Sequence, residues 1–214
     1  MLEILSNTNS IANHFIAELR DVECQKDRMR FRKNLERLGE IMAYEVSKTL
    51  DYHQQNIRTP LGVSKTNLLS NNPVVMTIMR AGLPFYNGFL NFFDKADSGF
   101  VGAYRIEGRD EVKIAGDYIA SGSITAKSLI LVDPMLATGR SLVSTLEKIL
   151  KFGEPKDIHL VSAIAAPEGI NYINENFDRP HTIWAGAVDE KLDENAYIIP
   201  GLGDAGDLSF GSKL

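Results

Sequence analysis

The chain has very little cysteine and no long apolar run. Cys24 is the only cysteine among 214 residues, so an internal disulfide bond is excluded. The longest apolar stretches are far too short to span a bilayer. The first residues include Glu3, Asn7 and Asn9 and lack the apolar core of a signal peptide. Together these absences predict a soluble cytoplasmic protein.

The sequence also lacks a block of basic residues, a histidine cluster and an internal repeat. The formal net charge is −5, which argues against a nucleic-acid-binding surface. The four histidines are scattered, with none paired at the spacing of metal ligands, so we expect no metal site made by protein side chains: His14, His53, His159 and His181. No repeat of roughly 20 to 50 residues is visible, which excludes solenoids and propellers.

The chain does contain enough apolar sequence for one substantial core. With 214 residues, 44% of them hydrophobic, it needs no second domain, and we expect a single domain over residues 1–214. Within it, residues 1–72 should form N-terminal helices and an arm, residues 73–190 an α/β core, and residues 191–214 a tail.

Apolar periodicity predicts helices first and a parallel sheet after them. Helices are expected at about 10–20 and 27–50, whereas residues 51–72 are polar and turn-rich and should form a loop or an extended arm. From Val74 onward strands, loops and helices alternate, which is the pattern of a parallel sheet covered by helices. The fold class is therefore α/β, with a central, mainly parallel sheet flanked by helices. The expected strands are 74–79, 100–106, 129–132, 158–165 and 182–188, and the polar segment 108–122 should be a mobile loop.

Residues 132–141 form the most informative segment. Their sequence, Val-Asp-Pro-Met-Leu-Ala-Thr-Gly-Arg-Ser, places an acid after an apolar strand and small residues before a helix. The backbone N–H groups of residues 137–141 have no strand partner and no helical acceptor, so they can hold an anion at the positive end of the helix dipole. The hydroxyls of Thr138 and Ser141 add two donors, and Asp133 can accept hydrogen bonds from vicinal hydroxyls. The segment predicts a sugar-phosphate site.

Two other interpretations of this segment are weighed against that prediction. A P-loop would need glycine at the position of Pro134 and lysine at that of Arg140, so an ATPase is disfavoured. An ordinary strand-loop-helix turn, with Ser141 as the helix cap, would need no ligand.

Two arginines are expected beside the same crevice. Arg80 follows the strand at 74–79 and precedes the unhindered amides of Ala81 and Gly82. Arg105 lies near the end of the neighbouring predicted strand. The planar guanidinium group matches phosphate oxygens with two hydrogen bonds, so the pair suits a pyrophosphate. Either arginine alone is better explained as a surface ion-pair partner.

The tail at 197–207 is the second strong signal. Three glycines, a proline and two aspartates lie within its last eight residues, so we expect neither a regular helix nor a strand there. Ile198, Ile199 and Phe210 supply apolar anchors, which argues against a disordered end. A loop with exposed backbone N–H and C=O groups suits the edge of a pyrimidine, which presents a carbonyl, an N–H and a second carbonyl in a row.

Together these segments resemble uracil phosphoribosyltransferases. Asp-Pro-Met-Leu-Ala-Thr-Gly-x-Ser is similar to the loop that binds phosphoribosyl pyrophosphate (PRPP) in that family. Ile-x-Arg-Ala-Gly and Tyr-Arg are similar to its pyrophosphate sites, and Gly-Leu-Gly-Asp-Ala-Gly-Asp to its uracil-recognition loop. The likeness extends from about Leu19 to the C-terminus. The chain departs from the usual pattern at Arg140, where most members have glycine, at Leu208, where a basic residue is usual, and at Ser212, where threonine is usual.

The resemblance implies a phosphoribosyltransferase-like fold with a C-terminal hood over the base, and conversion of uracil and PRPP to UMP and pyrophosphate in pyrimidine salvage. The implied PRPP contacts are Arg80, Arg105, Asp133, Pro134, Met135, Leu136, Ala137, Thr138, Gly139, Arg140, Ser141 and Asp204. The implied uracil contacts are Ile198, Gly203, Asp204 and Ala205. The implied catalytic residues are Arg80, Arg105, Asp133 and Asp204.

The resemblance also implies a cofactor and an assembly. Mg²⁺ would be carried by PRPP and not by protein side chains, because Pro134 stands where many related enzymes have a second acid. Homodimers or homotetramers are expected, with activation by GTP in some members, and we expect no nucleic-acid or membrane partner. Three alternatives stay open: an RNA-binding regulator built on the same fold, a phosphoribosyltransferase for another base such as hypoxanthine or orotate, and a non-catalytic nucleotide sensor that would bind PRPP without turnover.

Overall fold

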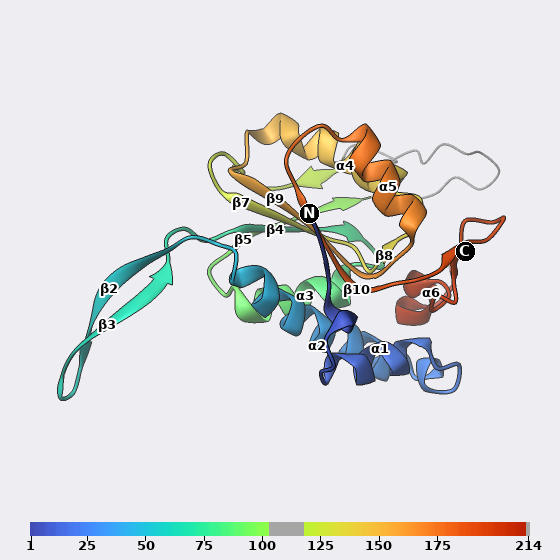
Figure 1. Ribbon diagram of the computed structural model, residues 1–214, viewed down its shortest axis with the longest axis horizontal. Helices are drawn as coiled ribbons and strands as arrows, with labels where there is room; N and C mark the ends of the chain where they lie inside the picture. Colours follow the sequence, from blue (N-terminus) through green and yellow to red (C-terminus); the bar gives the residue numbers. More distant parts are fainter. Residues whose placement is uncertain (103–117, 213–214) are drawn as a thin grey trace.

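A mainly parallel β-sheet forms the centre of the computed structural model, which describes residues 1–102 and 118–212 (Figure 1). Its strand order is β1-β10-β9-β7-β4-β5-β6, with β8 also paired to β9, and only β5 and β6 are antiparallel. The strands of this sheet are β1 Leu2–Ile4, β4 Val74–Met79, β5 Asp97–Gly102, β6 Ile119–Ala120, β7 Ser128–Val132, β8 Met135–Leu136, β9 Asp157–Ala165 and β10 Thr182–Val188.

Helices cover both faces of this sheet (Figure 1). On one face lie α4 (Arg140–Ile149) and α5 (Pro167–Asn176); on the other lie α2 (Arg28–Ser47) and α3 (Leu83–Phe92), with α1 (Ala12–Arg20) packed against α2. Successive side chains of β7 alternate between the two cores, since Ile130 and Val132 join the α2 side and Leu129 and Leu131 the α4 side. The sheet is therefore buried on both faces, as the uninterrupted apolar strands predict.

The helices α2 and α3 cross with their backbones in contact. Gly39 of α2 lies against the carbonyl of Phe85, and Gly88 of α3 lies against the backbone of α2, so a Cβ at either position would collide with main-chain atoms. Phe85 and Phe89 are fully buried beside this crossing, and their rings meet edge to face with centroids 5.7 Å apart. This packing fixes α3 and, with it, the loop between β4 and α3.

An antiparallel hairpin, β2 (Tyr52–Thr59) and β3 (Gly62–Leu69), projects from the body of the molecule as an arm (Figure 1). All of β2 and most of β3 are exposed, and the hairpin pairs with no other strand of the described chain. At its tip the Thr59 hydroxyl accepts hydrogen bonds from the backbone N–H groups of Leu61 (3.4 Å) and Gly62 (3.1 Å). The segment expected to be a loop or an extended arm is thus an arm with regular strands.

Most of the predicted elements are confirmed. The helices expected near 10–20 and 27–50 are α1 and α2, and Asp27 caps α2 by accepting from the backbone N–H groups of Met29 and Arg30. The strands expected at 74–79, 129–132, 158–165 and 182–188 are β4, β7, β9 and β10. The strand expected at 100–106 is described only as far as Gly102, in β5, and its remainder lies outside the described residues, as do residues 108–117 of the expected loop. No helix in the described ranges is long and apolar enough to cross a membrane.

The prediction that the tail contains no regular structure is wrong. A short hairpin, β11 (Lys191–Leu192) and β12 (Ile198–Ile199), is followed by the helix α6 (Ala205–Phe210). The helix forms because the Asp204 carboxylate accepts hydrogen bonds from the backbone N–H groups of Gly206 (2.7 Å) and Asp207 (2.9 Å). A good cap thus outweighs the low helix propensity of one glycine. The remaining short elements are the 3₁₀ turns Leu5–Asn7, Cys24–Lys26 and Leu150–Phe152.

Candidate active site

The strand order reverses between β4 and β7, and open α/β sheets bind ligands outside the carboxyl ends of their strands at such a point. From β4 the chain moves to β5 on one side and later returns to β7 on the other. The segments that leave the two carboxyl ends are residues 80–82 and the loop that begins with Asp133. The topology therefore brings together two segments that the sequence analysis had singled out separately.

The loop after β7 presents backbone N–H groups to a ligand. β8 pairs with β9, and α4 begins at Arg140 with Gly139 as its N-cap. No backbone N–H group of residues 137–141 donates a hydrogen bond to another residue that the structure describes. These groups lie at the positive end of the α4 dipole, so they can bind a phosphate. Since α4 begins before Ser141, the alternative in which Ser141 caps the helix is wrong.

Two close backbone contacts set the shape of this loop. Gly139 has a φ of +76°, which residues with a Cβ rarely adopt, and a Cβ there would come within 2.6 Å of the Gly169 carbonyl oxygen. Gly169, in the first turn of α5, lies in turn against the carbonyl of Ala137, where a Cβ would collide. The loop is therefore packed onto α5 and holds its shape without a ligand.

Asp133 is half-buried at the carboxyl end of β7. Its backbone N–H donates to the Val161 carbonyl (3.0 Å), and the Thr77 hydroxyl donates to the Val132 carbonyl (3.0 Å), so both neighbouring strands hold this end of β7. Burial raises the pKa of the Asp133 carboxyl to about 7, against the opposing effect of a hydrogen bond from the Met135 backbone N–H. Such a shift in a crevice is typical of functional carboxyls.

Arg80 connects the crevice to the tail. Its Nη2 donates to the Gly211 carbonyl (3.0 Å) and to Asp207 Oδ1 (3.3 Å), and the guanidinium carbon lies 5.9 Å from the centre of the Phe210 ring. Its Nε is buried and has no hydrogen-bond partner among the described residues. Arg80 is thus held against α6 through Nη2, while its buried Nε is unpaired among the described residues.

The tail residues expected to contact a base lie next to the loop after β4. A Cβ on Gly206 would be 3.7 Å from the Cβ of Ala81, which places the start of α6 against that loop. Ile198 and Ala205 are buried, whereas Gly203 and Asp204 are exposed. Asp204 caps α6 through Oδ1, which accepts the hydrogen bonds from the backbone N–H groups of Gly206 and Asp207.

The structure does not bring every predicted residue to the crevice. Arg105 lies outside the described residues. Arg140 is exposed, and its guanidinium carbon lies 5.4 Å from the centre of the Tyr172 ring on α5, where a cation is stabilised without a phosphate. Nowhere in residues 1–102 and 118–212 do three or more His, Cys, Asp or Glu side chains gather closely enough to hold a metal ion.

Two residues beneath the tail were not among those predicted from the sequence. Arg20 and Asp189 form an ion pair that also holds the backbone of Gly201. Asp189 directly follows β10, as Asp133 follows β7. The same pattern, an acid at the end of an apolar strand, would therefore have identified Asp189 from the sequence. Arg20 gives no comparable signal, because its partners are distant in sequence.

The raised pKa of Asp133 makes stability depend on pH in a defined direction. In the folded chain the carboxyl keeps its proton up to about pH 7, whereas its ordinary pKa is 3.8, so the free energy of unfolding falls as pH rises from about 4 to about 7. Asp133→Asn should therefore be more stable than the unaltered protein at about pH 8, by roughly 1–3 kcal/mol after allowance for partial exposure.

Thermal unfolding at about pH 4, 6 and 8 measures this effect, and the difference between the two proteins should shrink towards pH 4. Asp178→Asn, which neutralises an exposed carboxyl on the same molecule, is the control and should show no such trend. A stabilisation by Asp133→Asn that grows as pH falls would contradict the assignment.

Known proteins are similar to this chain both in sequence and in structure. A sequence model of the family "Uracil phosphoribosyltransferase" matches residues 6–212. The uracil phosphoribosyltransferase of Porphyromonas gingivalis is 47% identical over 211 residues, which cover 98% of each chain. The solved structure of the AQ2163 protein from Aquifex aeolicus has a TM-score of 0.84 at 34% identity and covers 100% of both chains.

A more distant structure shares the fold alone. The orotate phosphoribosyltransferase of Mycobacterium tuberculosis, solved in complex with PRPP, has a TM-score of 0.51 at 12% identity and covers 87% of this chain and 95% of its own. The sheet and its flanking helices therefore have the phosphoribosyltransferase fold. With a family match over nearly its whole length, the chain belongs to the uracil phosphoribosyltransferase family.

Proposed function

We propose that the protein transfers the 5-phosphoribosyl group of PRPP to N1 of uracil, giving UMP and pyrophosphate. One observation carries this proposal: at the switch point of the sheet, β7 ends before Asp133 and the loop of residues 137–141, and β4 ends before Arg80, which is hydrogen-bonded to the tail that resembles a uracil-recognition loop. Phosphoribosyltransferases generally use PRPP, so a sugar-phosphate site beside a base site is the arrangement that the reaction needs.

The residues after β7 would hold the ribose phosphate. The Asp133 carboxylate would accept hydrogen bonds from the vicinal ribose hydroxyls, and the N–H groups of residues 137–141 would bind the 5′-phosphate. The hydroxyls of Thr138 and Ser141 would add donors. Pro134 and residues 135–136 would lead the chain into this loop, because β8 is anchored on β9.

Arg80 and Arg105 would bind the pyrophosphate. In the reaction the bond from C1′ to the pyrophosphate oxygen breaks, the bond from uracil N1 to C1′ forms, and the N1 proton is released. C1′ becomes cation-like while the leaving group gains negative charge, so fixed cationic donors directed at its oxygens lower the barrier. Asp133 would hold the ribose in place as this happens.

The tail would recognise the base. Uracil presents two carbonyls and an N–H along one edge, and the exposed backbone of Gly203, with Ile198 and Ala205, would bind that edge. Asp204 would lie between uracil and PRPP. Its role as the cap of α6 supports this placement, because it fixes the start of the helix next to Ala81.

Mg²⁺ would enter on PRPP. Asp133 is the only carboxylate between residues 132 and 141, which supports a metal held mainly by the substrate. When bound, the ion neutralises charge on the pyrophosphate.

Product identification tests this function directly. The protein with PRPP and Mg²⁺ should form UMP from uracil and little IMP or OMP from hypoxanthine or orotate, because a site that hydrogen-bonds one base edge leaves polar groups unpaired with another. The same assay with and without GTP tests the activation implied by the resemblance.

Formation of IMP or OMP without UMP would refute the proposal. Tight, salt-sensitive binding of RNA in a filter-binding assay would favour a regulatory protein instead.

Arg80→Ala should lower kcat/KM by roughly 30- to 1,000-fold, or about 2–4 kcal/mol of transition-state stabilisation, if Arg80 binds the leaving group. The matched control is Asp207→Asn, which removes the ion pair between Arg80 and α6 but leaves the guanidinium in place. An equal loss of kcat/KM in both variants would mean that Arg80 acts only by holding the tail.

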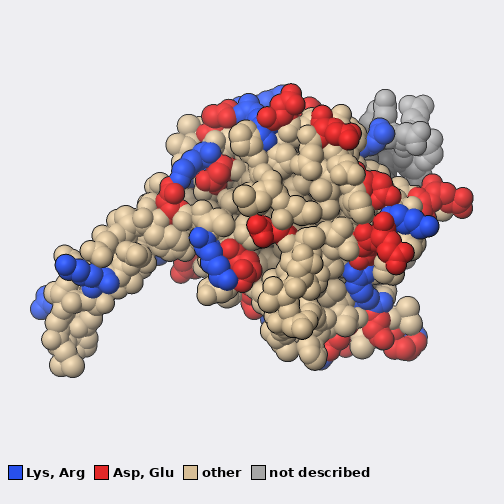
Figure 2. All heavy atoms as spheres, in the orientation of Figure 1, with Lys and Arg blue, Asp and Glu red and all other residues tan. Residues whose placement is uncertain are grey.

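We expect the arm to contact a second copy of the chain in a homodimer or homotetramer. A two-stranded hairpin is marginally stable alone, and this one exposes Tyr52, Leu61, Val63 and Leu68. Its strands and turn carry only the charged residues Arg58 and Lys65, and the arm is largely uncharged on the face in Figure 2. Sedimentation velocity should show an oligomer that the double variant Leu61→Asp, Val63→Asp weakens. A monomeric unaltered protein would contradict the expectation.

For the cellular location, the prediction from the sequence, the cytoplasm, is the one we propose.

A further inference from the structure

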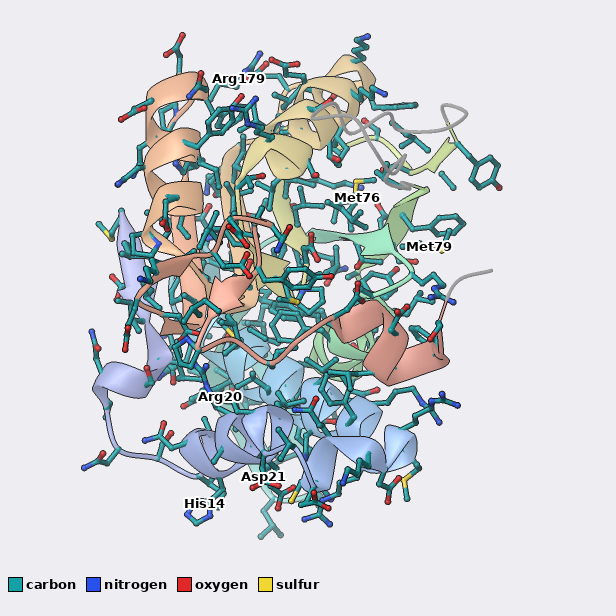
Figure 3. The ribbon with its side chains drawn as sticks, turned by 90° about the vertical axis from the view of Figure 1, so that its right-hand side faces the viewer. His14, Arg20, Asp21, Met76, Met79 and Arg179 are labelled. Atoms are coloured by element: carbon teal, nitrogen blue, oxygen red, sulfur yellow. The ribbon has the colours of Figure 1, made fainter. Side chains whose placement is uncertain are left out.

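An ion pair with two parallel hydrogen bonds lies beneath the tail. Arg20, at the end of α1, donates from Nη1 to Asp189 Oδ2 (2.8 Å) and from Nη2 to Asp189 Oδ1 (2.5 Å). The Asp189 side chain is only 4% exposed and that of Arg20 23%, so the pair is shielded from solvent. In Figure 3, Arg20 lies where α1 comes up beneath the C-terminal segment. The proposed mechanism uses neither residue.

Both members of the pair bind the backbone of Gly201. The Gly201 N–H donates to Asp189 Oδ2 (2.8 Å), and its carbonyl accepts from Arg20 Nη1 (2.9 Å). Gly201 has a φ of +61°, and a Cβ there would collide with the Ile198 carbonyl. Because both polar groups of this residue are held, the direction in which the chain continues to Gly203 is set.

The pair also closes the hairpin that precedes the loop. Asp189 stands at one foot of the β11–β12 hairpin and Gly201 at the other, and the Glu190 N–H donates to the Ile199 carbonyl (3.0 Å) just inside them. Ile198, the first residue expected to contact uracil, belongs to this hairpin and is buried. Loss of the pair would therefore free Gly201 and the end of the hairpin that leads into the loop.

The far end of the loop is held separately. Asp204 caps α6, Arg32 donates to the Ser209 carbonyl (2.7 Å), and Arg80 bonds to Gly211. Only Leu202, which is buried, and Gly203, which is exposed, lie between the two anchors. Gly203 makes no hydrogen bond to another residue within the described ranges, so its N–H and C=O are free to meet a ligand.

We propose that Arg20 and Asp189 are positioning residues for the uracil-recognition loop, an inference that rests on the proposed function. The guanidinium group suits this role because its planar fork binds a carboxylate with two donors and still reaches the Gly201 carbonyl. The pair holds the near end of the loop, and the contacts of α6 hold the far end. It touches neither PRPP nor uracil.

Asp189→Asn should raise the KM for uracil by roughly 10- to 100-fold, since a small displacement of a binding group has effects of that size. The KM for PRPP should change by less than about twofold, because the anion-binding loop is packed on α5 and independent of Arg20. Hydrogen exchange of backbone amides 198–206 should accelerate in the variant, which reports the release of the loop without relying on turnover.

Arg20→Lys is the second variant, for use if Asp189→Asn does not fold. A lysine keeps the charge opposite Asp189 but cannot make the three-bond fork to Asp189 and Gly201. The uracil KM should rise several-fold with little change in Tm.

Glu18→Gln is the matched control. Glu18 lies on the same helix and accepts two hydrogen bonds from Arg30, at 2.7 Å each, and one from Asn34 (2.6 Å), and it bonds to no described residue of the tail. It should leave the uracil KM and the exchange of residues 198–206 unchanged.

The outcomes separate the inference from the function on which it rests. If the unaltered protein forms UMP but Asp189→Asn keeps its uracil KM, or raises both KM values equally, the inference is wrong and the function stands. An equal rise in Glu18→Gln would show that the pair acts only through the stability of α1 and would also overturn it. If the unaltered protein forms no UMP, the proposed function fails and the inference fails with it.

Discussion

The parallel pairing of β4 with β7 is the constraint on which the rest of the site depends. Thr77 lies opposite Val132 in this pairing, and its hydroxyl donates to the Val132 carbonyl inside the sheet. The register sets how far each strand extends before its loop, so the residues after β4 and those after β7 leave the same edge side by side. A shift of one residue would turn every side chain of the strand to the opposite face, and both apolar cores oppose that shift.

Two kinds of contact hold the candidate site: backbone packing on one side and hydrogen bonds from charged side chains on the other. The loop of residues 137–141 has a defined shape because its backbone packs directly on α5 through Gly139 and Gly169. Between Gly201 and Asp204 the tail has one apolar anchor, the buried Leu202, and charged groups hold it on both sides: Arg20 with Asp189 on one side and Arg80 on the other. Charge-assisted hydrogen bonds are strong and directional, so they can define a short glycine-rich segment that packing alone would leave loose.

Asp133 shows how function and stability oppose each other at this edge. A carboxyl that is half-buried and has no cationic partner among the groups that shift its pKa is held against its preference for water, and its pKa rises to about 7 as a result. A neutral side chain at this position would avoid the cost of burying a charge. The loss of folding stability would be offset by hydrogen bonds to the hydroxyls of a bound sugar, and proteins commonly lose some stability at functional sites.

The sequence by itself determined the features that depend on neighbouring residues. Apolar runs and periodicity are local, so the α/β class, the strands β4, β7, β9 and β10, and the helices α1 and α2 could all be predicted. The loop with free backbone N–H groups before α4 was also predictable, because such groups at a helix start follow from the chain direction alone. The resemblance to a family then implied which base, uracil, and which leaving group, pyrophosphate, would bind beside that loop.

Only the tertiary structure decided the contacts between distant residues. Arg20 and Asp189 are 169 positions apart, and no periodicity indicates that they meet. Arg140 packs on Tyr172, Asp204 caps a helix in a segment expected to have none, and Arg80 bonds to the tail. In each case the partner is chosen by how the sheet and its helices pack in three dimensions, and a pattern along the chain carries no record of that packing.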